Sequence, residues 1–159
     1  SVFPLLEKGY PKYELLNKDT PYGKGDGSLL FDELTGSPSY GDGKWTGVKN
    51  KIEVNLDLGK SQKVTGTSVG VLTDPTSWIL PAKQIEIYAG NSEEKLTLVA
   101  KKEFQIEKSY AKGVNRHSLR FDGNYRYLKI SIEPFGEAPD WHEAAGKRAW
   151  LFVDEIIIY

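Results

Sequence analysis

The C-terminal run AWLFVDEIIIY, residues 149–159, carries two adjacent carboxylates in an otherwise apolar stretch. Such a run predicts a buried β-strand, and side chains alternate across a strand, so Asp154 and Glu155 are expected on opposite faces. Because burying an ionised carboxylate alone is very costly, at least one of them needs a metal ion, a basic side chain or a group of backbone N–H donors. The doublet is therefore a candidate site, with a structural salt bridge as the alternative.

Alternation of apolar and polar residues recurs along most of the chain, and helical periodicity is scarce. In IEVNLDLG, residues 52–59, the apolar side chains share one face and the acidic and amide side chains the other. Seven or more short strands separated by turn signals predict an all-β, antiparallel β-sandwich or barrel. Gly, Pro, Tyr and Asp are dense in the first fifty residues, which predicts a loop-rich N-terminal segment. Besides 52–59, the segments with strand composition are 64–72, 83–89, 95–100 with an extension toward 106, 117–121, 125–133 and 150–159.

Length and charge exclude several classes of protein. A chain of 159 residues is expected to form one domain, and 21 basic against 22 acidic residues leave no field that would attract nucleic acid or an anionic membrane. The absence of cysteine excludes disulfides, thiolate metal sites and cysteine nucleophiles. No stretch is long and apolar enough for a transmembrane segment.

The start of the chain predicts a segment of a longer protein. SVFPLL has neither an initiator Met nor a signal pattern, and the sequence contains no Met. We therefore expect residues 1–12 to be a linker or a remnant and residues 13–159 to be the folded module.

The lengths of the connections predict where a binding site lies. Short connections (GKSQK, GNSEE, DGN) alternate with long ones (TDPTSWILPA, the stretch near EKSYAKGVNR, and PFGEAPDWHEAAGKR). If successive strands run antiparallel, the long loops gather at one end of the sandwich with the lead-in YGDGKWTGVKNK, and such loops commonly carry binding sites. A separate strand at 101–106 would shift this order.

The four tryptophans are expected to differ in burial. Trp150, on the terminal strand, and Trp45, after a turn, are expected in the core. Packing and function are equally expected for Trp78. Trp141 lies in a polar loop of 15 residues and is expected to be exposed.

An exposed indole can stack on the apolar face of a sugar ring. Trp141 is the candidate platform, with His142 and Arg148 as partners for sugar hydroxyls and Trp78 as a second wall. This places a candidate carbohydrate site at the long-loop end.

The motifs of common enzyme classes are absent from the sequence. There is no GxSxG, HExxH, EF-hand or Walker sequence, and only two histidines, His117 and His142, limit triads and histidine metal sites. The DWHE segment offers an acid and a base in one loop, but nothing indicates the second carboxylate that glycoside hydrolysis requires. We therefore expect a non-catalytic chain.

Six segments of the sequence, taken in order, resemble the discoidin-like (coagulation factor type C) domains. These segments are FDELTGS, YGDGKW, VNLDLGKSQKV, SWILPAKQIEIYAG, YRYLKISIEP, and PDWH followed by AGKRAWLFVDEI. The version most similar is the C-terminal accessory domain of bacterial family 20 glycoside hydrolases, the β-N-acetylhexosaminidases. The resemblance covers 13–159. It implies a jelly-roll β-sandwich similar to galactose-binding domains and family 32 carbohydrate-binding modules, attached to an exported bacterial enzyme.

The resemblance also implies a structural calcium ion. Asp32 matches the acidic loop residue of related modules, Thr35 or Ser37 the hydroxyl, and Glu155 the glutamate of the terminal strand. Glu33 stands where the family usually has glycine, and a side chain there disfavours the left-handed turn.

These observations predict a carbohydrate-binding or accessory module of an exported glycoside hydrolase, with a glycan or the catalytic domain as its partner. One alternative is a purely structural domain covered by the parent enzyme. Another is a protein or surface adhesion module, which requires exposed apolar loop tips, and only Ile79 and Leu80 offer one.

Overall fold

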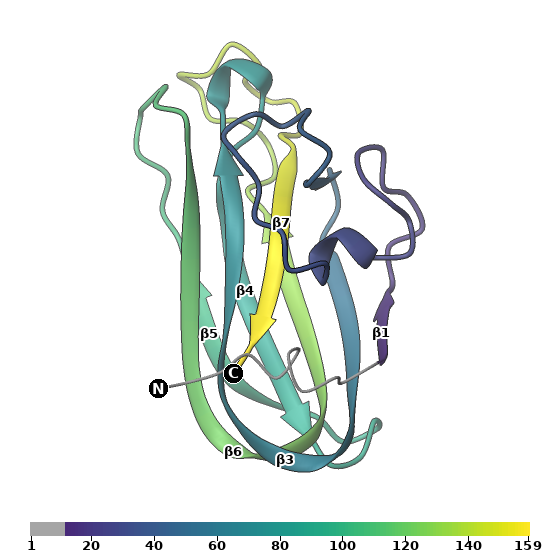
Figure 1. The fold of residues 1–159 in the computed structure, drawn as a ribbon. Coiled ribbons are helices and arrows are strands. Elements are labelled where there is room, and N and C mark those ends of the chain that lie inside the picture. Colours follow the sequence, from purple (N-terminus) through teal and green to yellow (C-terminus); the bar gives the residue numbers. More distant parts are fainter. Residues whose placement is uncertain (1–11) are drawn as a thin grey trace.

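Two long bent strands, β3 (Ile52–Thr73) and β6 (Gly113–Pro134), run through both layers of a β-sandwich (Figure 1). The structure is a computed structural model in which residues 12–159 are described. The remaining elements are β1 (Lys12–Leu15), β2 (Thr46–Val48), β4 (Ala82–Gly90), β5 (Thr97–Glu103), β7 (Leu151–Ile158) and the short 3-10 helices η2 (Ser28–Leu30) and η3 (Pro75–Ser77). The predicted linker lies outside the described residues except for Lys12, which begins β1.

Each layer is an antiparallel sheet. The first contains β1, the first half of β3, the second half of β6, β4 and β5. The second contains β2, β7, the second half of β3 and the first half of β6. The predicted all-β antiparallel sandwich is confirmed. Within the described part of the chain, no helix is long and apolar enough to span a membrane.

Two of the predicted turns are bends inside continuous strands. The segments 52–59 and 64–72 form one strand, as do 117–121 and 125–133, because β3 and β6 stay paired through the bend. Their register shifts between Asp57 and Gln62, and Gly59 adopts a left-handed φ of 84° there. The prediction of separate strands at these positions was wrong.

The predicted gathering of the long loops is confirmed. β5 is a single strand ending at Glu103, so no separate strand occupies 104–106. The connections 74–81, 104–112 and 135–150 therefore meet at one end of the sandwich, at the top of Figure 1. The bends of β3 and β6 and the β4–β5 turn lie at the other end.

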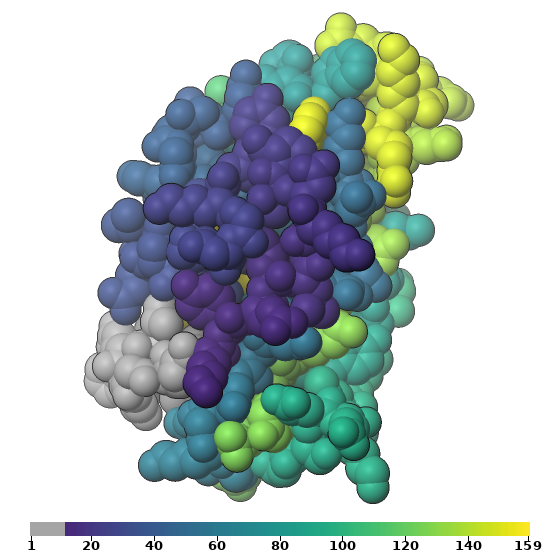
Figure 2. Space-filling view, turned by 90° about the vertical axis from the view of Figure 1, so that its right-hand side faces the viewer, coloured from purple at the N-terminus to yellow at the C-terminus, as the bar shows by residue number. Residues whose placement is uncertain are grey.

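The inner faces of the two sheets enclose the main core, and a second cluster lies on the outer face of the second sheet. In that cluster Trp45, only 2% exposed, packs with Leu72, Ile79 and Phe152, which confirms its predicted burial. Figure 2 shows the N-terminal segment, purple to blue, spread over one face of the molecule. Trp150 is only partly buried at the cluster's margin, with the Lys49 ammonium 4.8 Å from its ring centroid. Its predicted place in the core was wrong.

A β-bulge in β7 changes the direction of the acidic doublet. Val69 pairs with Ile156 and Val71 with Val153, so Asp154 and Glu155 together lie opposite Gly70. The side chains of residues 151, 153, 156 and 158 therefore point into the core, and both carboxylates lie on the outer face of the sheet. The prediction that they occupy opposite faces was wrong because it assumed unbroken alternation.

Because Gly70 has no side chain, Asp154 and Arg116 can meet directly over it, so Gly70→Ala should be strongly destabilising. A Cβ at this position would overlap the Asp154 carboxylate and come 2.5 Å from Arg116 Nη2. We expect the free energy of unfolding, measured by urea denaturation, to fall by about 3 kcal/mol. Gly113→Ala is the matched control on a neighbouring strand, because nothing lies within 4 Å of its added Cβ. Equal losses in the two variants would contradict the assignment.

Candidate functional site

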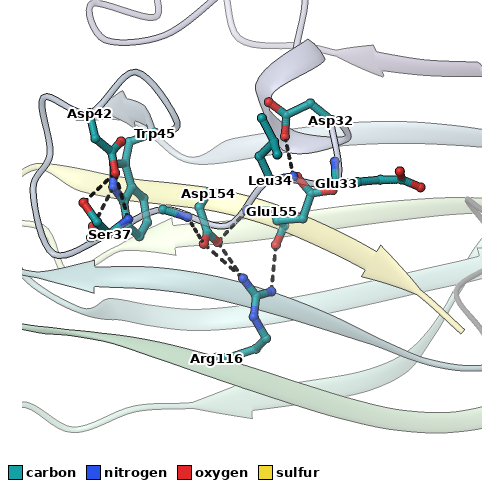
Figure 3. Close-up of polar contacts among 10 residues, drawn as sticks. Asp32, Glu33, Leu34, Ser37, Asp42, Trp45, Arg116, Asp154 and Glu155 are labelled. Atoms are coloured by element: carbon teal, nitrogen blue, oxygen red, sulfur yellow. Dashed lines mark hydrogen bonds and ion pairs between the residues drawn. The ribbon is translucent and has the colours of Figure 1, made fainter.

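The loop between η2 and β2 meets the acidic doublet of β7 (Figure 3). Asp154 accepts two hydrogen bonds from Arg116 Nη2, at 2.9 and 3.0 Å, and one from the Gly36 N–H at 2.9 Å. Glu155 accepts a hydrogen bond from the Glu33 N–H at 3.0 Å. Both carboxylates therefore bind the same loop. Asp154 thus has the basic partner and the backbone N–H donor that the sequence led us to expect for a buried carboxylate.

Glu155 lacks the charge compensation that Asp154 has. It is 1% exposed, and its Oε1 has no hydrogen-bond partner among the described residues. Arg116 reaches only the backbone oxygen of Glu155, at 3.2 Å. Burial, together with the neighbouring Asp32 carboxyl, raises the pKa of Glu155 to about 9. At neutral pH this site therefore favours a proton on Glu155, or a cation beside it.

Of the other two predicted metal ligands, Asp32 lies next to Glu155 and Ser37 does not. Asp32 lies beside Glu155 and accepts a hydrogen bond from the Leu34 N–H at 3.0 Å. The Ser37 hydroxyl instead donates to Asp42 at 2.6 Å, on the far side of Asp154 in Figure 3. Within residues 12–159, no group of three or more His, Cys, Asp or Glu side chains is arranged to hold a metal ion. A cation here would rely on Asp32 and Glu155 and on backbone carbonyls.

Glu33 adopts the turn that its side chain was expected to disfavour. Its φ is 65°, in the left-handed region, at the position where the resembling family usually has glycine. Such a conformation costs a non-glycine residue about 1 kcal/mol or more. The hydrogen bond from its N–H to the buried Glu155 carboxylate offsets part of that cost.

At the long-loop end of the sandwich, the three connections bind one another through backbone and side-chain groups. The Trp150 N–H donates to the Trp78 carbonyl at 2.9 Å, and the Leu80 N–H donates to the Trp150 carbonyl at 3.2 Å. The Tyr110 hydroxyl donates to the Trp141 carbonyl at 2.8 Å. Lys112 pairs with the buried Asp74 at 3.6 Å. Residues far apart in the sequence are thus held in one surface.

His142 supports this surface from below. It is 3% exposed, with Nδ1 accepting from the Ala144 N–H at 3.0 Å and Nε2 at 2.7 Å from the Pro75 carbonyl. Since Nδ1 accepts, Nε2 carries the proton and donates to Pro75. His142 was predicted to be a partner for sugar hydroxyls, but both of its ring nitrogens are already engaged in hydrogen bonds within the protein.

The other predicted carbohydrate residues lie closer to solvent. Trp141 is half-buried, not fully exposed as expected, and its ring meets Tyr110 edge to face at 5.4 Å. Trp78 is also half-buried, and its Nε1 donates to Glu143 at 3.0 Å. Arg148 is exposed and lies 3.4 Å from Asn50. The structure therefore brings both Trp78 and Trp141 edge to face with the buried His142, at centroid distances of 6.5 and 5.9 Å.

Sequence reasoning missed Tyr110, the most exposed large aromatic side chain at this end. It is 53% exposed and contacts Trp141 through both its ring and its hydroxyl. Its position in the polar stretch EKSYAKG is the same signal that singled out Trp141.

The loop tip that the adhesion alternative relied on is not exposed. Ile79 and Leu80 are 1% and 0% exposed, because each packs into a buried cluster beneath the loops.

The fold matches solved carbohydrate-binding modules. Chitosan-binding module 1 of a chitosanase/glucanase from Paenibacillus sp. IK-5 superposes with a TM-score of 0.60 at 12% identity, covering 99% of each chain. The Clostridium perfringens module CpGH89CBM32-5, solved with GalNAc-β-1,3-galactose, gives 0.59 at 10% identity, again over 99% of each chain. A Ruminococcus gnavus GH29 fucosidase solved with fucose gives 0.58 at 13% identity, with 99% of this chain matching 26% of that one.

No family model matches the sequence, and no curated protein matches it. The structural matches therefore show the fold alone: the chain has the discoidin-like β-sandwich found in family 32 carbohydrate-binding modules.

The raised pKa of Glu155 predicts a loss of stability as the pH rises. The folded state holds this proton up to a pKa of about 9, whereas the unfolded carboxyl has a value of 4.5, so the stabilisation is complete below pH 4.5 and is lost as the pH approaches 9. Burial and nearby Lys102 and Arg116 lower the pKa of His117 from 6.5 to about 4. Titration of His117 therefore raises the free energy of unfolding with pH, but only up to about pH 6.5, so it does not affect the range from pH 7 to 9. We expect the free energy of unfolding, measured in chelator, to fall by about 2 kcal/mol from about pH 7 to 9.

Glu155→Gln is the control for this measurement. The amide does not titrate, so the variant should show no comparable slope between pH 7 and 9. A flat profile for the unaltered protein would mean that Glu155 is ionised throughout and carries a different partner.

Proposed function

We propose that this chain is a non-catalytic carbohydrate-binding module that uses the long-loop end of its sandwich. The observation that carries this proposal is that three loops bring their aromatic side chains together: Trp78 and Trp141 each contact the buried His142, and Tyr110 contacts Trp141. Sugars present one apolar ring face and a fringe of hydroxyls, so a site needs partly exposed aromatic rings with polar groups beside them. Here Glu143, Lys147 and Arg148 would supply those polar groups.

The neighbours in fold support the same proposal, since several are named as carbohydrate-binding modules and others belong to enzymes that act on glycans. By this proposal the chain is part of an exported bacterial glycoside hydrolase. A β-N-acetylhexosaminidase is the parent that the sequence resemblance favours. The catalytic domain of that enzyme would then be the second partner of the module.

We further propose that calcium binds at Asp32 and Glu155 and has a structural role. The Oε1 of the buried Glu155 has no hydrogen-bond partner within residues 12–159 and fits this ion, because Ca²⁺ prefers carboxylate and carbonyl oxygens. The ion would neutralise Glu155 in place of the proton and tie the loop at 32–33 to β7. Ser37 is not included, because its hydroxyl already binds Asp42.

Trp141→Ala should abolish glycan binding with only a modest loss of stability. Stacking of one ring contributes on the order of 1 kcal/mol, so dissociation constants between tens of micromolar and millimolar are expected. Binding is measured by isothermal titration with N-acetylglucosamine and galactose-type oligosaccharides. Tyr40→Ala is the matched control, because Tyr40 is a 40% exposed aromatic residue that contacts Tyr22 and Phe152 instead of this site.

Two outcomes would contradict the loop-end site. Loss of several kcal/mol of stability in Trp141→Ala would make this side chain a packing residue. No binding of any glycan by the unaltered protein would favour the alternative of a structural domain packed against its catalytic partner.

Calcium should raise the melting temperature, and Glu155→Gln should remove that effect. A ligand that binds only the folded state stabilises it in proportion to its occupancy. Because the ion competes with a proton on Glu155, the shift should grow from pH 6 to pH 9. The measurement is a set of thermal melts with millimolar calcium or chelator. Identical melts at every pH would contradict the metal site and leave the protonated form of Glu155.

A further inference from the structure

The outer face of the first sheet forms a groove far from the long-loop site. Two adjoining cavities of about 1000 and 380 Å³ lie there, and they share Asn55, Glu93, Glu94 and Leu96 in their walls. The shared walls make them one continuous depression. It crosses β1, β3, β6 and β4, and the β4–β5 turn closes one side.

The strand registers fix the floor of this groove. Glu14, Asn55, Lys129 and Tyr88 lie side by side in one row across the four strands. These side chains point outward, since the alternate positions of β3 are buried in the core. With neighbouring strands about 4.8 Å apart, the row spans about 14 Å, which suits an extended chain better than a single ring.

The adjacent row adds an aromatic side chain and an open position. Lys12, Asp57 and Tyr127 are cross-strand neighbours, and Gly90 follows on β4 without a side chain. The β4–β5 turn packs on Gly90, where an added Cβ would come 2.5 Å from the Lys95 carbonyl. This packing places the acidic turn beside the groove.

The groove is negatively charged. Among the described residues, seven acidic and three basic side chains line the two cavities, a formal charge of −4 for this part of the lining in a chain of net charge −1. Glu53 is compensated by Lys51 at 2.8 Å and Lys129 at 4.0 Å, and Asp57 by Arg126 at 2.9 Å. Among residues 12–159, no basic side chain forms an ion pair with Glu14, Glu93 or Glu94.

We propose that this groove binds an oligosaccharide that carries protonated amino groups. The uncompensated carboxylates match the ammonium groups, and Asn55 and Ser131 offer hydrogen-bond partners for sugar hydroxyls. Tyr88 adds an aromatic side chain to the lining, whereas the Arg126 guanidinium lies over the Tyr127 ring, 4.9 Å from its centroid. The ligand class rests on the proposed function of the module as a carbohydrate binder. The site itself is separate from the long loops.

The test is titration of the full 159-residue chain with a fully deacetylated glucosamine hexasaccharide at low salt, followed by calorimetry and by NMR mapping. We expect chemical-shift changes on β3, β4 and β6, and binding that weakens with added salt. Glu93→Gln with Glu94→Gln should lower the affinity about tenfold. Glu107→Gln with Asp122→Asn removes two exposed acidic groups outside the groove and should leave the affinity unchanged.

Trp141→Ala separates this proposal from the loop-end site. It should retain hexasaccharide binding in the groove while losing binding of neutral glycans. Hexasaccharide binding that disappears in Trp141→Ala would overturn the groove and support the loop-end site.

Three other results would overturn the groove: no binding, equal losses in the two acidic double variants, or equal binding of N-acetylated hexasaccharide. A hexalysine peptide that binds as tightly as the sugar would also overturn the proposal, since it would show a general surface for cations.

Discussion

The ion pair between Arg116 and Asp154 is the contact on which one whole flank of the sandwich depends. Asp154 receives two hydrogen bonds from β6 and one from Gly36, so a single carboxylate joins the sheet to the loop that covers it. A buried pair of this kind adds little net stability compared with apolar packing, but removal of one partner leaves a buried charge that costs about 3–5 kcal/mol. Its effect is to fix where the loop lies.

The same bulge that makes this ion pair also creates the unusual chemistry of Glu155. By placing both carboxylates on one face, it puts two acidic groups in a space where one guanidinium is available. Arg116 directs both terminal nitrogens to Asp154 and to a backbone oxygen, and none to the Glu155 carboxylate. Burial without such a partner raises the pKa of Glu155 to about 9, which favours a proton or an added cation at this position. The backbone N–H of Glu33, a residue with a left-handed φ, donates a hydrogen bond to the Glu155 carboxyl group.

Sequence patterns predicted the parts of this structure that depend on neighbours along the chain, and missed those set by distant contacts. Apolar residues at 151, 153, 156 and 158 have spacings of two, three and two, and the odd step marks the bulge that simple alternation overlooked. The bends GKSQK and DGN have turn composition, and only the continued pairing of β3 with β6 shows that they are not hairpin loops. The polar segment containing His142 suggested exposure, but a contact with Pro75, 67 residues away, buries its ring.

The two surfaces proposed for ligands differ in how tightly they are coupled to the fold. At the long-loop end, His142 and backbone hydrogen bonds hold the loops at 74–81 and 135–150 together, so an outward side chain such as Arg148 can change without disturbing that support. In the groove, the floor is the register of β3 against β6 itself, and a one-residue slip would turn Asn55 and its row into the core. Ligand preference can therefore vary at the loops while the groove persists as long as the sandwich does.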